Sequence, residues 1–132
     1  MKKKWKFENQ NEKMKKGISL FVLLFLLLTL TNCKKEESIL KVFVRSASNQ
    51  LINGAKVIVI GDQQSNPPTG AFVNTAYTNS SGFATINMDD YFSSDNTTGY
   101  FDINVKYETK VGTGYSRCRA HTTSVETIYL KN

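Results

Sequence analysis

Residues 100–108, Tyr-Phe-Asp-Ile-Asn-Val-Lys-Tyr-Glu (YFDINVKYE), show the clearest alternation of apolar and polar side chains in the chain. Successive side chains of a β-strand point to opposite faces, so this pattern predicts a strand with one buried and one exposed face. The inward side chains are predicted to be Phe101, Ile103, Val105 and Tyr107, and the outward ones Asp102, Asn104 and Lys106.

Six further short runs of β-branched and aromatic residues, separated by Gly, Asn, Asp, Ser and Pro, predict strands at 39–45, 55–61, 71–78, 83–88, 114–120 and 124–130. A tight turn is predicted at 79–82 and polar loops at 62–70 and 89–99. A parallel sheet needs crossover helices, for which these short connections leave no room. The pattern therefore predicts an all-β fold, a seven-stranded antiparallel β-sandwich.

The positive charge of the chain, +6 in total, is concentrated at its start. Residues 1–33 hold seven lysines and two glutamates, which gives +5, whereas residues 34–132 hold ten basic and nine acidic side chains, which gives +1. The predicted domain is electrostatically balanced, so the charge does not indicate nucleic-acid binding.

An apolar run of 13 residues without a charge, Ile18 to Leu30, follows two lysines. A bilayer span needs about 20 residues, so the run is short for a transmembrane helix and has the length of a signal-peptide core. Met14 is an alternative start to Met1, and the sequence does not decide between them.

The next residues, LTNC at 30–33, resemble the lipobox of bacterial lipoproteins, in the relaxed form typical of Bacteroidota, although Asn32 stands where a smaller residue is usual. The resemblance implies a signal peptide over 1–33 that ends at a lipidated Cys33. It implies an anchor in the outer membrane, with the periplasmic or external face left open, and KKEES at 34–38 resembles the charged tether of such lipoproteins. The length of the chain and the strand pattern predict a single domain at 39–132. An uncleaved signal anchor is the alternative.

The second cysteine, Cys118, has no partner if Cys33 is acylated, so no disulfide is predicted. His121 lies three residues further on, which places the two side chains on opposite faces of a strand and argues against a Cys–His nucleophile. We expect a buried Cys118 and a His121 at the end of the strand. No catalytic residue, metal or cofactor is predicted.

Aromatic and basic side chains near the 89–99 loop are the candidates for contact with a protein or glycan partner: Tyr91, Phe92, Tyr100, Arg117 and Arg119. The aromatic residues could instead close one end of the core. The two arginines share a face with Tyr115 and could pair with Asp102 or Glu126. The oxygen-rich side chains of the loop would permit Ca²⁺ binding, but their spacing matches no EF-hand.

The segments Gly54–Val59 (GAKVIV), 75–78 with two threonines, Asn79–Gly82 (NSSG) and Phe83–Ile86 (FATI) resemble carboxypeptidase-regulatory-like, or transthyretin-like, β-sandwich domains with an Ig-like architecture. Hydroxyisourate hydrolases of that fold end in Tyr-Arg-Gly-Ser. This chain ends Tyr-Leu-Lys-Asn, so no catalytic role is carried over.

These observations lead us to expect a membrane-anchored, non-enzymatic binding or structural module. The alternatives are an enzyme, or a Ca²⁺-binding or glycan-binding protein, with a site at 89–100. A small accessory lipoprotein that caps another protein is a further alternative.

Overall fold

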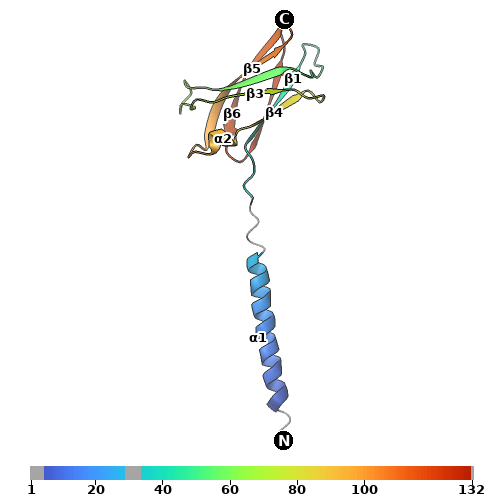
Figure 1. The fold of residues 1–132 in the computed structure, drawn as a ribbon, viewed down its shortest axis with the longest axis vertical. Coiled ribbons are helices and arrows are strands. Elements are labelled where there is room, and N and C mark those ends of the chain that lie inside the picture. The colour runs from blue at the N-terminus through green and yellow to red at the C-terminus, as the bar shows by residue number, and fades with distance from the viewer. Residues whose placement is uncertain (1–4, 29–33, 132) are drawn as a thin grey trace. The chain divides into compact units, whose positions relative to one another are not determined.

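The structure is a computed structural model that describes residues 5–28 and 34–131. The chain divides into two units, residues 1–35 and 36–132. The helix α1, Trp5–Leu28, lies in the first unit (Figure 1). No helix within the described residues is long and apolar enough to cross a membrane. Cys33 lies outside the described residues.

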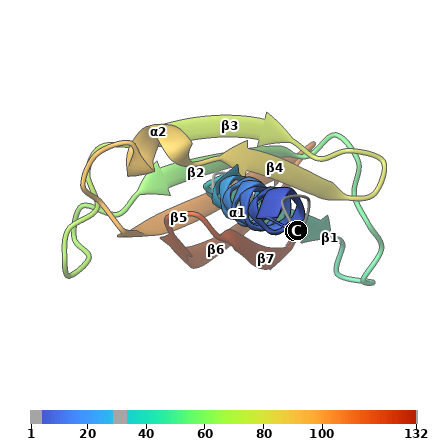
Figure 2. The same ribbon diagram turned by 90° about the horizontal axis from the view of Figure 1, so that it is seen from below.

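The second unit contains seven strands, as the sequence predicted. Their bounds are β1 Ile39–Arg45, β2 Lys56–Gly61, β3 Val73–Tyr77, β4 Phe83–Asn87, β5 Thr98–Tyr107, β6 Lys110–Arg119 and β7 Thr123–Tyr129. They form a three-stranded sheet in the order β4-β1-β7 and a four-stranded sheet in the order β3-β2-β5-β6. Figure 2 shows β3 beside β4 at one margin of the domain and β6 beside β7 at the other.

A single hydrophobic core lies between the two sheets. The four-stranded sheet contributes the side chains predicted from the alternation of residues 100–108, and Phe101, Ile103 and Val105 are fully or almost fully buried. The facing β1 contributes its own alternate positions, Leu40, Val42 and Val44. Since both sheets bury one face and expose the other, the alternation in the sequence accounts for the layered architecture.

The prediction that all strands are antiparallel was wrong for one pair. β1 runs parallel to β7, in the register from Ile39 opposite Thr123 to Arg45 opposite Tyr129. Parallel neighbours need a long connection, which is usually a helix. Here the first and last strands of the domain are the pair, so all the intervening strands serve as the connection and no crossover helix is needed.

The predicted polar loop at 89–99 begins as a one-turn helix, α2, Asp89–Phe92. The carbonyl oxygen of Met88 accepts hydrogen bonds from the backbone N–H groups of Tyr91 and Phe92, both at 3.1 Å. The turn directs two aromatic side chains into the core, where each is 8% exposed. The need to cover the end of the core therefore outweighs the polar character of the segment.

β6 begins four residues earlier than predicted, at Lys110 instead of residue 114. Gly112 lies in the stretch that was left out of the predicted strand, and together with Gly114 it marks a close approach of β7. A Cβ atom on Gly112 would lie 2.7 Å from Cγ2 of Ile128, and one on Gly114 would collide with Cδ1 of the same side chain. The glycines thus allow β7 to pack against β6.

The predicted turn at 79–82 is confirmed. The N–H of Gly82 donates to the carbonyl oxygen of Asn79 at 2.8 Å, and the N–H of Ser81 donates to the Asn79 side-chain oxygen at 3.0 Å. Gly82 has a φ of +72°, and Gly54 has a φ of +77°, a region that other residues enter only with strain. A Cβ atom on Gly82 would also lie 2.7 Å from Cβ of Leu51, whereas one on Gly54 would meet open space.

These two glycines give a matched test of the packing at the turn. Gly54→Ala should lower the free energy of unfolding by about 1–2 kcal/mol, the penalty for a left-handed backbone alone. Gly82→Ala should lower it by a further ~1 kcal/mol or more, because its methyl group must displace Leu51. Chemical denaturation of both variants measures the difference. Equal losses would show that Leu51 does not pack on the turn.

Candidate partner-binding surface and tether junction

The structure brings Tyr100 and Arg117, two of the predicted partner-binding residues, together on the exposed side of the four-stranded sheet. They are directly opposite each other on β5 and β6. The guanidinium carbon of Arg117 lies 5.8 Å from the centroid of the Tyr100 ring, within the range of a cation–π contact. Tyr115 stacks on the same ring, with centroids 6.2 Å apart and planes inclined by 24°.

Tyr115 is fixed by a further contact, since its hydroxyl group donates to Oδ2 of Asp62 at 3.0 Å. Partial burial raises the pKa of this phenol, and the bond to Asp62 and the charges of Asp62 and Asp102 raise it further. The hydroxyl group therefore stays protonated and remains a donor at neutral pH. The bond holds the loop after β2 against β6 and gives the aromatic group a defined position.

Asp102, one of the two predicted partners of the arginines, is not directly opposite either of them. Tyr100 stands opposite Arg117, and Thr98 opposite Arg119, whereas Asp102 stands opposite Tyr115. Both arginine side chains are exposed. They are available to a partner at the surface.

Of the five candidates for partner contact, Tyr91 and Phe92 lie in the core. Their rings are 4.9 Å apart and nearly perpendicular, and Tyr91 makes similar edge contacts with Phe72 and Phe101. Of the two roles considered for these residues, closing one end of the core is the one the structure has. Three of the five predicted partner-binding residues thus remain at the surface: Tyr100, Arg117 and Arg119.

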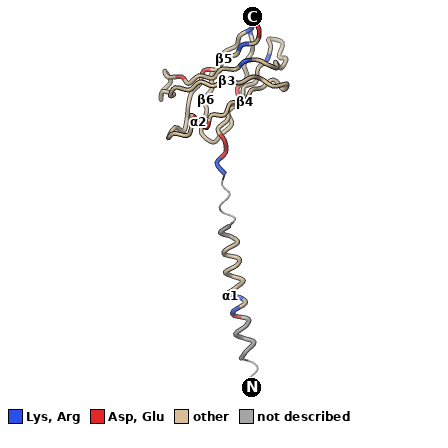
Figure 3. The backbone as a smooth tube through the Cα atoms, viewed as in Figure 1, with Lys and Arg blue, Asp and Glu red and all other residues tan. Residues whose placement is uncertain are grey.

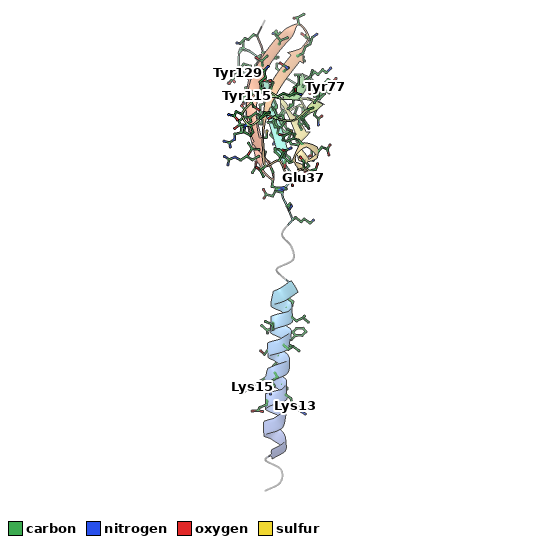
Figure 4. All side chains as sticks on the ribbon, turned by 90° about the vertical axis from the view of Figure 1, so that its left-hand side faces the viewer. Lys13, Lys15, Glu37, Tyr77, Tyr115 and Tyr129 are labelled. Carbon is green, nitrogen blue, oxygen red and sulfur yellow. The ribbon has the colours of Figure 1, made fainter. Side chains whose placement is uncertain are left out.

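The outer face of the four-stranded sheet, defined as the outward side chains of β3, β2, β5 and β6, carries more apolar surface than these residues alone. Val73 is 70% exposed and Tyr77 63% exposed on β3, and Val111 and Tyr115 are exposed on β6. Tyr77 and Tyr115 are labelled in Figure 4. Val73 and Tyr77 were not among the predicted partner-binding residues. Their signal was the alternation in 71–78, which places Val73, Thr75 and Tyr77 on one face.

Acidic and basic residues are interspersed over the domain (Figure 3). Within residues 5–28 and 34–131, no group of three or more His, Cys, Asp or Glu side chains is placed to hold a metal ion. Asp89, from the loop considered for Ca²⁺, uses its carboxylate in a different contact, with Ser38, the last residue of the predicted tether. We call the contacts among Glu36, Ser38, Asp89 and His121 the tether junction.

At this tether junction, Ser38 is buried although it was predicted to belong to the tether. Its N–H donates to Oδ1 of Asp89 at 2.7 Å, and its hydroxyl oxygen accepts from the N–H of His121 at 2.9 Å. The Nδ1 of His121 lies 2.9 Å from the carbonyl oxygen of Glu36 and must donate, because a carbonyl only accepts. The start of the domain is thus held by residues 51 and 83 positions away in sequence.

Cys118 is 2% exposed, as expected, and His121 lies in the turn after β6 with an exposed side chain. Burial raises the pKa of the Cys118 thiol. A buried thiol with a raised pKa is a weak nucleophile, so this cysteine acts as a core residue.

Comparisons with protein-family models and with curated proteins give no match. Among solved structures, the chain is similar to the Bacillus anthracis TIE protein, with 14% identity and a TM-score of 0.49 over 74% of this chain and 17% of that one. It is also similar to chlorocatechol 1,2-dioxygenase from Pseudomonas putida, with 12% identity and a TM-score of 0.45 over 76% of this chain and 63% of that one. The chain spans less than two thirds of the length of either neighbour.

The tether junction predicts a pH-dependent contribution to stability. The pKa of Asp89 is lowered from 3.8, chiefly by the hydrogen bond from the Ser38 N–H and also by the nearby charge of His121. A lowered pKa gives stability that is present above the ordinary value and is lost as the pH falls through the folded-state value. Asp89→Asn should therefore reduce the free energy of unfolding at pH 7, and the reduction should shrink below pH 3.8.

Chemical denaturation at pH 7 and in acid measures this dependence. Asp90→Asn, which removes the same charge from the neighbouring exposed side chain, is the matched control. If Asp89→Asn lowered stability equally at both pH values, the carboxylate would not be the group that holds Ser38.

Proposed function

We propose that this chain is an envelope lipoprotein, held in the outer membrane by acyl groups on Cys33, whose domain binds a protein partner without catalysing a reaction. The observation that carries the proposal is the position of Cys33. An apolar run of 13 residues stops three residues before it, and the charged residues KKEE follow it at once. Each buried CH₂ group of an acyl chain contributes about 0.8 kcal/mol to membrane binding, so two or three chains suffice as an anchor.

The tether junction supports this arrangement. Ser38 is five residues after Cys33, and five extended residues reach about 17 Å at ~3.4 Å each. Because Ser38 is buried and hydrogen-bonded, the ordered domain begins immediately after this short segment. A lipid on Cys33 would therefore hold the domain close to the membrane surface.

The side chains considered for chemistry have structural contacts, which favours a binding role. Asp89 holds Ser38, the His121 ring donates to Glu36, and Cys118 is buried. The exposed apolar side chains lie instead on the outer face, where they can contact another molecule.

A protein partner fits this face better than a glycan. Sugars stack on free aromatic ring faces, but the Tyr100 ring is already in contact with Tyr115 and Arg117. The exposed aliphatic side chains of Val73 and Val111 are suited to packing against a protein surface. The sandwich itself is, in this proposal, of the carboxypeptidase-regulatory-like and transthyretin-like kind that segments 54–59 and 75–86 resemble.

Intact mass spectrometry of the protein extracted from membranes tests the anchor. We expect a mass that begins at Cys33 and includes acyl groups. Cys33→Ser should remove the acyl mass and release the protein from the membrane, since the thiol is the attachment point. Cys118→Ser, at the buried cysteine, is the control and should keep the acyl mass. A wild-type mass that retains residues 14–32 without acyl groups would overturn the proposal in favour of an uncleaved anchor.

A further inference from the structure

The outward side chains of the four-stranded sheet form rows that cross its strands. One row consists of Val73, Ile60, Asp102 and Tyr115, which are direct neighbours from β3 to β6. Another row, four residues away along each strand, consists of Tyr77, Lys56, Lys106 and Val111. The middle row between them is uncharged and includes Ile58 and Asn104. The charges of β5 are therefore of opposite sign on the two sides of Asn104.

The two outer rows are complementary when a two-fold axis relates two copies of the chain, so that each outer row of one copy faces the other outer row of the second copy. The relevant axis lies in the plane of the face, runs perpendicular to the strands and passes through the middle row. It places Asp102 of one copy opposite Lys106 of the second copy, and the apolar side chains opposite one another. Lys56, whose four-carbon stem is apolar, faces Ile60.

We propose that the outer face of the four-stranded sheet is the interface of a homodimer, in which a second copy of this chain packs face to face with its strands reversed. Each copy then supplies the same patch, as a two-fold interface requires. Facing sheets lie about 10 Å apart and are rotated by about 30°, which displaces Asp102 and Lys106 only slightly because they are one row from the axis.

The charges also select this orientation over the other face-to-face arrangement. A two-fold axis parallel to the strands would keep the rows in place and exchange the columns. Lys56 would then face Lys106 of the second copy, and Ile60 would face Asp102. Like charges and an unpaired carboxylate against an apolar side chain are both unfavourable, so the reversed arrangement is the one that the pattern specifies.

The dimer rests on the proposed function, because the interface is small. Four strands at ~4.8 Å spacing give a face about 19 Å wide, and an interface of this size buries on the order of 1,000 Å², which is typical of weak complexes. Attachment to one membrane raises the effective concentration and populates such a dimer. The two-fold axis then lies along the membrane normal, and the strands of both copies run parallel to the membrane.

Cross-linking in the membrane tests the orientation. In the reversed dimer, position 104 of one copy faces position 104 of the second copy, close to the two-fold axis. Full-length Asn104→Cys, treated in isolated membranes with a bis-maleimide whose spacer is about 10 Å, the distance between facing sheets, should give a covalent dimer. Thr85→Cys, at an exposed position on β4 in the other sheet, is the matched control, and the unmodified chain gives the background. We expect about tenfold more dimer from position 104 than from position 85, as for a specific contact.

Charge exchange in the Asn104→Cys background tests the partner. Asp102→Lys should lower the yield of cross-linked dimer about tenfold, because the new lysine of each copy would face Lys106 of the other copy. Adding Lys106→Asp should restore the yield, because the exchanged pair is again complementary in a homodimer. If position 104 gave no more dimer than position 85, or if the exchange did not restore the yield, the homodimer would be excluded and the face would belong to a different protein.

The mass of the same membrane-extracted protein separates this inference from the proposed function. Acylated protein with no specific cross-link would leave the lipoprotein intact and overturn the dimer. A specific cross-link that follows the charge exchange, in protein without acyl groups, would support the dimer and overturn the lipid anchor.

Discussion

The pairing of β5 with β2 on one side and β6 on the other is the interaction on which the rest of the domain depends. It buries Phe101, Ile103 and Val105 against the three-stranded sheet. A slip of one residue in this pairing would move those side chains into solvent and bring Asp102 and Lys106 into the core. The register that builds the core is therefore the same register that arranges the charges of the outer face. The alternation of side chains along β5 therefore determines both the packing of the core and the order of charges on the outer face.

The junction at Ser38 has a similar importance for the way the domain is held. The first residues of the domain bond to α2 and to the turn after β6. β1 follows directly and is the central strand of its sheet, with β4 and β7 on either side. The first strand is thus secured at its start and along both edges, although it is nearest to the tether. In the proposed lipoprotein, this arrangement fixes the strand that lies next to the anchor.

Much of the fold could be predicted from the sequence because its strands are strictly alternating. β1 was predicted with its observed bounds, and the inward positions of β5 were identified correctly. The errors occurred where tertiary packing overrides local signals. The first four residues of β6 were missed, because the reason for Gly112 in that stretch, the approach of Ile128, comes from another strand. The parallel pair β1–β7, the burial of Ser38 and the helical turn at Tyr91 likewise depend on partners far away in the sequence, which no local pattern reports.

The surface was harder to predict than the core for the same physical reason. A buried position can be recognised in the sequence because it is apolar. The role of an outward side chain depends instead on its neighbours across the sheet. Asp102 and Lys106 look like ordinary solvent-facing charges along β5. Only the register with β2 and β6 shows that they belong to two complementary rows. Because both side chains are outward, exchanging them leaves the core of β5 unchanged. In the proposed dimer, association and folding should therefore be separable, because the charges of the outer face can be exchanged without changing the side chains of the core.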